Sequence, residues 1–193
     1  ISVCGYNHTG KTTVCEVLIK GLKARGFSVC SIKDIHNETF TMEKGGSNSD
    51  RHYQAGAEPV FARGLGETDL IWRKQLSFLE MLPHLHADWL IVEGMRDIAM
   101  PRIVCGDDPQ KIAEMVNETV FAVSGKYADE HDKYGGLPVL SAVNNSEKLV
   151  ELALAKGFDV LPQADPECCS HCGMNCHEFT GAVLRGERKR NEC

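Results

Sequence analysis

The 193-residue sequence lacks the features that mark membrane proteins, nucleic-acid-binding proteins and repeat proteins. No apolar run approaches the roughly 18 residues that a membrane-spanning helix needs, and no charged-then-apolar leader precedes the first motif. No basic cluster occurs before residue 185, and the formal net charge is −6, which disfavours a broad surface for a phosphate backbone. No internal repeat or low-complexity stretch is present. We therefore expect a cytoplasmic globular protein that binds neither membranes nor nucleic acid and holds any anion locally.

Short apolar runs alternate with helical patterns along most of the chain. The runs predict strands at 1–4, 28–33, 58–62, 68–72, 88–94, 101–105 and 119–125, and helices at 11–25, from near 49, at 75–86 and at 146–156. Strands that are apolar throughout and separated by helices imply a largely parallel sheet covered on both faces. The predicted fold is therefore three-layer α/β. Two prolines and two acids in residues 161–167 indicate a linker, so the predicted domains are residues 1–160 and 161–193.

The stretch GYNHTGKTT, residues 5–13, fits the phosphate-loop pattern G-x-x-x-x-G-K-[ST] and predicts a P-loop nucleotide-binding fold. Its glycines allow backbone N–H groups to turn toward a phosphate. Lys11 is expected to reach the β and γ phosphates and the Thr12 hydroxyl to ligate Mg²⁺, while the following helix points its positive end at the anion. The predicted nucleotide-binding residues of the loop are Gly5, Asn7, His8, Thr9, Gly10, Lys11, Thr12 and Thr13.

A triphosphate site also needs a carboxylate for the metal, usually at the end of a neighbouring strand. Glu93 ends the run 88–94 and is the leading candidate, both as a Mg²⁺ ligand and as a catalytic residue beside Lys11. Asp34 follows the run 28–33 and is the second candidate. Asp88 begins the strand that Glu93 ends, so it is expected at the opposite edge of the sheet. A helix cap or a solvated turn acid is the alternative for Glu93 and for Asp34.

Four segments follow one another in the first 105 residues: GYNHTGKTT, SIKDIH, GGSNSDRHYQAGAEPV and DWLIVEGMRDIAMPRIV. In this order and spacing they resemble the MobB family of molybdopterin-guanine dinucleotide biosynthesis adaptor proteins, a branch of the P-loop GTPases. The resemblance covers about residues 1–160, and its most specific parts are the run from Ser49 to Ala57 and LIVEG with Pro101 after it. The chain departs from the family at Asn48, where an aspartate is usual, and in a histidine run reduced to residues 34–36.

The resemblance implies a GTP-binding homodimer with Mg²⁺ and slow GTP hydrolysis. Such a protein assists a molybdenum cofactor guanylyltransferase in attaching GMP to molybdopterin, in molybdenum or tungsten cofactor maturation. It also implies that Arg51, His52 and Arg96 face the nucleotide or the pterin phosphate, with plain surface positions or a salt bridge as the alternatives. No N-K-x-D signature for guanine is present, so the preference for GTP is implied by the resemblance alone.

The nine cysteines are unevenly placed. Cys4, Cys15, Cys30 and Cys105 lie singly among apolar residues and are expected to fill the core. The other five crowd residues 168–193, and four thiolates at these spacings can converge on one metal centre. The predicted ligands are Cys169, Cys172, Cys176 and Cys193.

This tail resembles the four-cysteine iron–sulfur module of Rnf-type electron-transfer and corrinoid iron–sulfur proteins, although it has one residue fewer between the second and third cysteines. The ligand count fits a [4Fe–4S] cluster or Zn²⁺, and unligated or disulfide-forming thiols are a third possibility. Cys168 is an alternative to Cys169. His171 and His177 are alternative ligands for zinc.

Two other functions stay open at this point. In one, the protein is a non-enzymatic redox-sensing or metallocofactor-insertion adaptor, in which nucleotide occupancy and the tail gate binding to a molybdoenzyme. In the other, it is a small-molecule P-loop kinase. A kinase needs a lid that bears arginines, and residues 107–117 do not supply one.

Overall fold

The computed structural model describes residues 1–163, 169 and 172–193. The chain forms two compact units, one of residues 1–34 with 85–193 and the other of residues 35–84, and each is described by itself. None of the helices in the described ranges combines the length and the apolar character needed to cross a bilayer.

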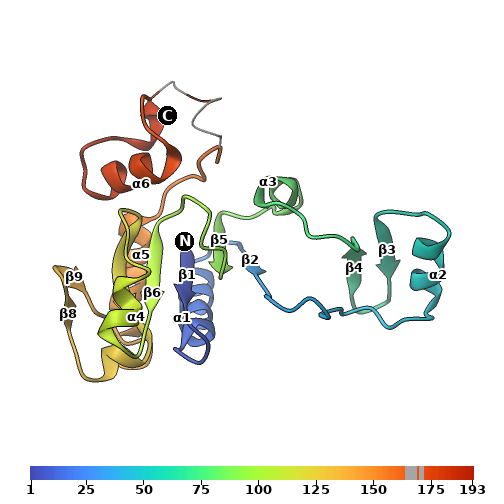
Figure 1. The fold of residues 1–193 in the computed structure, drawn as a ribbon, viewed down its shortest axis with the longest axis horizontal. Coiled ribbons are helices and arrows are strands. Elements are labelled where there is room, and N and C mark those ends of the chain that lie inside the picture. The colour runs from blue at the N-terminus through green and yellow to red at the C-terminus, as the bar shows by residue number, and fades with distance from the viewer. Residues whose placement is uncertain (164–168, 170–171) are drawn as a thin grey trace. The chain divides into compact units, whose positions relative to one another are not determined.

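The larger unit is built on a five-stranded sheet with the order β2-β5-β1-β6-β7, in which all neighbouring strands run parallel (Figure 1). Its strands are β1 Ser2–Gly5, β2 Val29–Lys33, β5 Trp89–Glu93, β6 Arg102–Cys105 and β7 Val120–Ser124. The predicted parallel α/β sheet is confirmed. Because the strands are parallel, their carboxyl ends meet at one edge, which is where open α/β sheets bind ligands.

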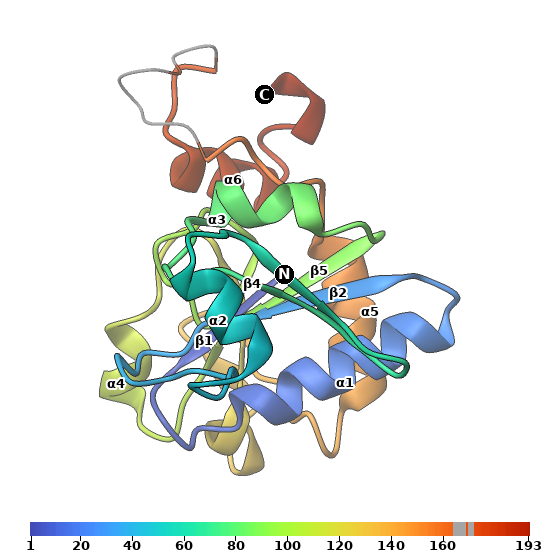
Figure 2. The same cartoon turned by 90° about the vertical axis from the view of Figure 1, so that its right-hand side faces the viewer.

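Helices α1 and α5 pack side by side against this sheet (Figures 1 and 2). Val14, Leu18 and Leu22 of α1 are buried, as their spacing predicts. The helices of the unit are α1 Lys11–Ala24, α4 Pro109–Ala113, α5 Ser146–Lys156 and α6 Cys176–Leu184, with 3₁₀ turns η2 Gly125–Asp129 and η3 Arg190–Glu192. A short antiparallel hairpin joins β8 Lys133–Tyr134 to β9 Leu137–Pro138.

The core of this unit consists of two apolar clusters. The larger joins α1 and α5 to the central strands, and the smaller gathers Ile112 of α4 with Val104 and Val123 of the sheet. Cys4, Cys15 and Cys105 are buried, as predicted for core-filling thiols, whereas Cys30 is only half-buried.

The C-terminal helix α6 packs through Phe179 and Ala182, each 1% exposed. Asn175 caps its first turn, because its side chain accepts from the amide of Glu178 while the Glu178 carboxylate accepts from the Asn175 amide. The division into domains at residue 160 stays a prediction.

The smaller unit contains helix α2 Asn48–Gln54, the antiparallel hairpin of β3 Val60–Arg63 with β4 Thr68–Ile71, helix α3 Phe78–Met81 and the 3₁₀ turn η1 Leu82–His84. The predicted helix over 75–86 is therefore wrong in extent. Ser77 starts α3 late as its capping residue, and Pro83 cannot donate the amide hydrogen that a continuing helix requires. Within this unit Arg73 pairs with Asp50 at 2.6 Å.

Candidate functional site

The phosphate loop between β1 and α1 has the backbone that its glycines predict. Gly10 adopts a φ of 96°, and a side chain at Gly5 would collide with the carbonyl oxygen of Cys105. The Thr9 hydroxyl donates to the Tyr6 carbonyl oxygen at 2.9 Å, and the Lys11 ammonium donates to the same oxygen at 2.7 Å. No side chain caps the amino end of α1, and its first turn carries no acidic residue. The helix amides therefore face the loop with their positive end.

A cavity of about 660 Å³ opens on this loop. Its lining residues come from the phosphate loop, the end of β5, the turn after β7 and the segment that leads into α5. They are Asn7, His8, Gly10, Lys11, Thr12, Thr13, Glu93, Gly125, Lys126, Asp129, Ser141, Ala142 and Val143. The volume falls within the range of small-molecule and cofactor sites. The loop thus forms one end of a cavity large enough for a whole nucleotide.

The two oxygen ligands expected to hold a metal, from Thr12 and Glu93, lie together at this end of the cavity. The Thr12 hydroxyl donates to Oε1 of Glu93 at 2.9 Å, and the Glu93 side chain is 12% exposed. A hydroxyl and a carboxylate are ligands suited to Mg²⁺. The Lys33 ammonium lies 2.8 Å from the same Glu93 oxygen, so a cation already occupies the position between these groups. Lys33 is a site residue that the sequence reasoning did not identify.

Asp34 and Asp88 have other roles in the structure. Oδ2 of Asp34 accepts from the amide of Met95 at 3.2 Å, in the turn after Glu93, and Asp34 does not line the cavity. Asp88 accepts from the amide and the hydroxyl of Ser28 at the opposite edge of the sheet, where it was predicted. These hydrogen bonds lower the pKa of Asp88. Of the two carboxylates predicted as metal ligands, Glu93 is therefore better placed than Asp34.

The far wall of the cavity is attached directly to the phosphate loop. The Lys126 amide donates to the Thr9 carbonyl oxygen at 3.3 Å, and a Cβ atom on Gly125 would collide with that oxygen. The hydroxyl of Ser124, which precedes this turn, donates to the carbonyl oxygen of Leu140. Phosphate loop, turn and the 141–143 segment are thus held in a fixed relation.

Lys126, Asp129 and residues 141–143 were also missed from the sequence. The signal that was available is a K-x-x-D pair directly after the apolar strand at 119–125. It differs from the N-K-x-D pattern in two ways, because Gly125 stands where the asparagine is expected and two residues instead of one separate Lys126 from Asp129.

The three predicted basic ligands are distributed over both units. The Arg96 guanidinium lies over the Tyr6 ring, 5.2 Å from its centroid, next to the phosphate loop. Arg51 and His52 belong to α2 of the smaller unit, where both are exposed. Their contribution to a ligand site stays a prediction.

The cysteine tail contains four free thiols among the described residues: half-buried Cys169, Cys172 and Cys176, and exposed Cys193. Burial raises the pKa of Cys193, and the other three thiols act in the same direction. Within the described ranges, however, no three potential ligands are gathered closely enough to hold a metal ion.

Of the three alternative ligands of the tail, His177 alone lies among the described residues. Cys168 and His171 lie outside the described residues. Burial lowers the pKa of His177, and the charge of Arg102 adds to this effect. The predicted metal centre therefore stays a prediction.

Comparison with known proteins gives a consistent family context. The family model for molybdopterin guanine dinucleotide synthesis protein B matches residues 1–126. A molybdopterin-guanine dinucleotide biosynthesis adapter protein of Haemophilus influenzae is 30% identical over 139 residues, covering 69% of this chain and 78% of the relative. A Bacillus subtilis protein named a probable adapter of the same kind is 24% identical over 147 residues, covering 74% and 84%.

A solved structure matches the fold. The crystal structure of Bacillus subtilis MobB has a TM-score of 0.64 and 22% sequence identity, covering 81% of this chain and 96% of that one. At this identity the likeness bears on architecture, and it agrees with the parallel α/β sheet described above.

Proposed function

The chain belongs to the molybdopterin guanine dinucleotide synthesis protein B family, and we propose that it is a GTP-binding adaptor with slow GTP hydrolysis in molybdenum or tungsten cofactor maturation. The observation that carries this proposal is the 660 Å³ cavity, which joins a phosphate loop to a second wall suited to a base. The adapter names of the relatives support a role in molybdopterin-guanine dinucleotide biosynthesis. In this proposal the protein acts in the cytoplasm, beside a guanylyltransferase that joins GMP to molybdopterin.

The phosphate end of the cavity would bind the nucleotide through the chain's own donors. Lys11 exchanges the Tyr6 carbonyl oxygen for phosphate oxygens, and the α1 amides donate to the same anion. Thr12 and Glu93 fit Mg²⁺ as an oxygen pair that already binds the ammonium of Lys33. When bound, the metal would supply positive charge that neutralises the phosphates.

The far wall favours guanine. The apolar stem of Lys126 and the 76% exposed side chain of Val143 offer surfaces to a purine ring. An ionised carboxylate only accepts hydrogen bonds. Asp129 therefore suits the adjacent N1–H and N2–H₂ donors of guanine, whereas adenine has an unprotonated N1 and no amino group at these positions.

Slow hydrolysis follows from what lines the cavity. Among its described lining residues there is no arginine to stabilise the charge that develops on the transferred phosphoryl group. An arginine in that role is worth a factor of roughly 10³–10⁵ in rate. A partner protein would have to complete the site, which suits an adaptor better than a kinase.

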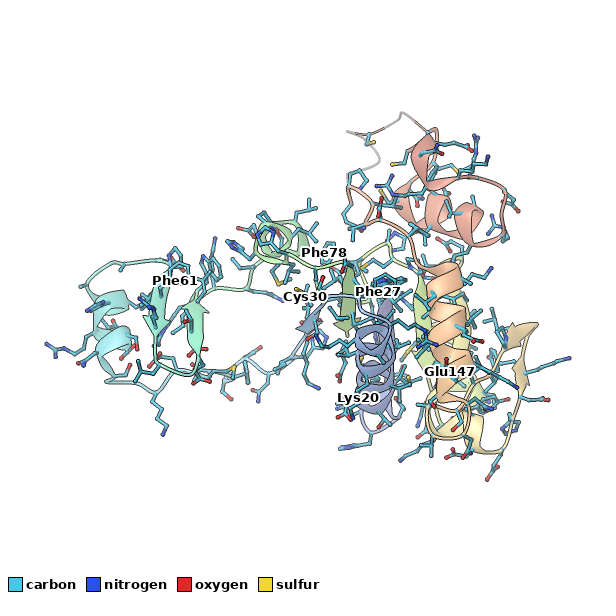
Figure 3. All side chains as sticks on the ribbon, turned by 180° about the vertical axis from the view of Figure 1, so that it is seen from behind. Lys20, Phe27, Cys30, Phe61, Phe78 and Glu147 are labelled. Carbon is cyan, nitrogen blue, oxygen red and sulfur yellow. The ribbon has the colours of Figure 1, made fainter. Side chains whose placement is uncertain are left out.

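Two further parts of the proposal concern assembly and the tail. Apolar side chains exposed on the smaller unit, such as Phe61 at 68% (Figure 3) and Met42 at 88%, support a homodimer that covers them. The sequence spacing of the four free tail thiols supports a cysteine-ligated metal, either a [4Fe–4S] cluster or Zn²⁺. Sedimentation tests the dimer, and the iron, sulfide and zinc content of an anaerobic preparation tests the tail.

The central test is calorimetry of the full chain with GTP and ATP in the presence of magnesium, followed by turnover assays with and without a guanylyltransferase and molybdopterin. We expect GTP to bind more tightly than ATP and turnover to be negligible without the partner. Lys11→Ala should weaken GTP binding by roughly 10- to 100-fold, the equivalent of a charged hydrogen bond. Lys23→Ala, at an exposed position of the same helix, should not. An absence of nucleotide binding at millimolar concentration would refute the proposal.

A further inference from the structure

A second cavity, of about 170 Å³, is lined by residues that the proposed nucleotide site does not use. It is bounded by β1, β6, the turn after β5 and the segment after α4. Its lining residues are Cys4, Arg96, Arg102, Glu114, Met115, Val116 and Asn117. Two of the seven are arginines, so the charge of a ligand that fits this cavity depends on whether other groups neutralise them.

Arg102 is a buried cation in the lining of this cavity, with only 3% of its surface exposed. Its Nε donates to the Ser2 hydroxyl at 3.1 Å, and its Nη2 donates to the carbonyl oxygens of Arg96 and Ile98 at 3.0 and 2.9 Å. No carboxylate of the described residues lies within ion-pairing distance of the guanidinium, and none of these bonds uses Nη1. A buried charge is costly unless it is paired. The carbonyl dipoles compensate it only in part.

The remaining charges around the cavity do not cancel that of Arg102. Glu114 is the one carboxylate among the lining residues, and it accepts a hydrogen bond from the Tyr6 hydroxyl. Arg96 lies over the same Tyr6 ring, and the lining thus sets the single negative charge of Glu114 against the two positive charges of Arg96 and Arg102. Burial raises the pKa of Cys4 in the lining, and the charge of Arg102 opposes that rise. One positive charge is left over.

We infer that this cavity binds a small tetrahedral oxyanion, either a free ion or the phosphate group of a phosphomonoester. At roughly 30 Å³ for each water-sized group, its volume holds about five heavy atoms, which is the size of a phosphate. Guanidinium groups bind phosphate oxygens through paired N–H donors. Arg102 supplies the buried donor and exposed Arg96 the second. The inference does not depend on nucleotide binding in the larger cavity.

The test is calorimetry of the full chain carrying Lys11→Ala, because this change weakens the other anion site. The probes are inorganic phosphate and glycerol 3-phosphate. We expect one anion per chain, weakened roughly 10- to 100-fold by Arg96→Met or Arg102→Met, as for a lost charged hydrogen bond. Glu114→Gln removes the opposing charge and should tighten binding, an effect that a purely structural role for this residue does not produce.

Arg102→Lys keeps the charge and serves as the conservative variant if Arg102→Met fails to fold. Arg96 and Glu114 are exposed, so variants at these two positions still test the inference if Arg102→Met does not fold. Tighter binding of glycerol 3-phosphate identifies a phosphomonoester site, and tighter binding of inorganic phosphate identifies a free-ion site. If the Lys11→Ala protein binds neither probe below about 10 mM, or binds them equally well with Arg96→Met and Glu114→Gln, the inference is overturned.

Discussion

The ammonium of Lys33 and the carboxylate of Glu93 lie 2.8 Å apart, at the carboxyl ends of two neighbouring strands. The same Glu93 oxygen accepts from the Thr12 hydroxyl, which is itself 3.4 Å from the Lys33 nitrogen. The Lys33 side chain is 54% exposed and that of Glu93 only 12%. The lysine can therefore leave without disturbing the core, while the carboxylate is fixed in position.

Removing the lysine should change the requirement for magnesium. With Lys33→Met, Mg²⁺ no longer competes with an ammonium for Glu93, so half-saturation should need roughly two- to five-fold less Mg²⁺, the equivalent of one exposed ion pair. Glu93→Gln should need roughly ten-fold more or worse. The measurement is a Mg²⁺ titration at fixed GTP.

The control for this pair is Lys20→Met. Lys20 lies on α1 (Figure 3), and its side chain is 77% exposed. Among the described residues it pairs with Glu16 alone, one turn away. GTP binding by the Lys20→Met variant should depend on Mg²⁺ as it does in the parent. Identical titrations for Lys33→Met, Glu93→Gln and the parent would show that Glu93 does not hold the metal and that Lys33 does not compete with it.

Asp129 should decide which base is bound. Asparagine presents a donor and an acceptor in place of two acceptors, so Asp129→Asn should weaken GTP binding by roughly 10- to 100-fold. Xanthine carries a C2 carbonyl oxygen where guanine carries an amino group, so the same variant should gain affinity for XTP. Competition binding with GTP and XTP measures this change in preference.

Asp132→Asn is the matched control, because Asp132 is a nearby exposed acid outside the cavity lining. It should leave the ratio of GTP to XTP affinity unchanged. Retention of full GTP affinity by Asp129→Asn, with Lys11→Ala still defective, would contradict base reading by Asp129 and leave the phosphate site intact.

Gly125→Ala should damage both stability and nucleotide binding. Gly125 has a φ of 79°, and an added Cβ would collide with the Thr9 carbonyl oxygen of the phosphate loop. We expect a loss of about 2 to 4 kcal/mol in the free energy of unfolding, from the left-handed backbone and the displaced loop. Urea denaturation measures it. Gly45→Ala, where a Cβ meets nothing within 4 Å, should be nearly neutral.

Stability should fall in alkaline solution because of the buried thiols. Burial raises the pKa of Cys15 to about 12 and also raises that of Cys105, whereas an unfolded thiol titrates near about 8.5. The unfolded state loses these protons first, so their contribution is complete below about pH 8.5 and is lost as the pH rises toward 12. Cys15→Ala should therefore show a shallower decline between about pH 8 and pH 11 in urea unfolding. Parallel declines would contradict this assignment.

The parts of the fold that depend on local sequence could be predicted well. The run from Ser2 through the loop to Ala24 has a motif, an apolar strand and a helical stripe that agree with one another, and Glu93 follows from the end of the best apolar run. The prediction of a helix over 75–86 was also wrong for a local reason. A cap at Ser77 and a proline at Pro83 outweigh the periodicity between them.

The rest of the site depends on which strands become neighbours. Lys33 meets Glu93 only because β2 pairs with β5, and Asp129 reaches the cavity only because the turn after β7 packs on the phosphate loop. Strand order is not encoded in the spacing of any one segment. Arg102 shows the same limit, since its burial beneath the turn after β5 could not be inferred from a single basic residue in an apolar run.

Because β2 and β5 run in parallel, the chain between them must return from one edge of the sheet to the other, a task that often needs only one helix. Here the connection includes the whole unit of residues 35–84, while the two strands are joined by their own ladder and by the Ser28–Asp88 contact. This stretch is therefore suited to exchange between homologues. A chimera that carries residues 35–84 of another relative should keep its nucleotide chemistry and associate with different proteins.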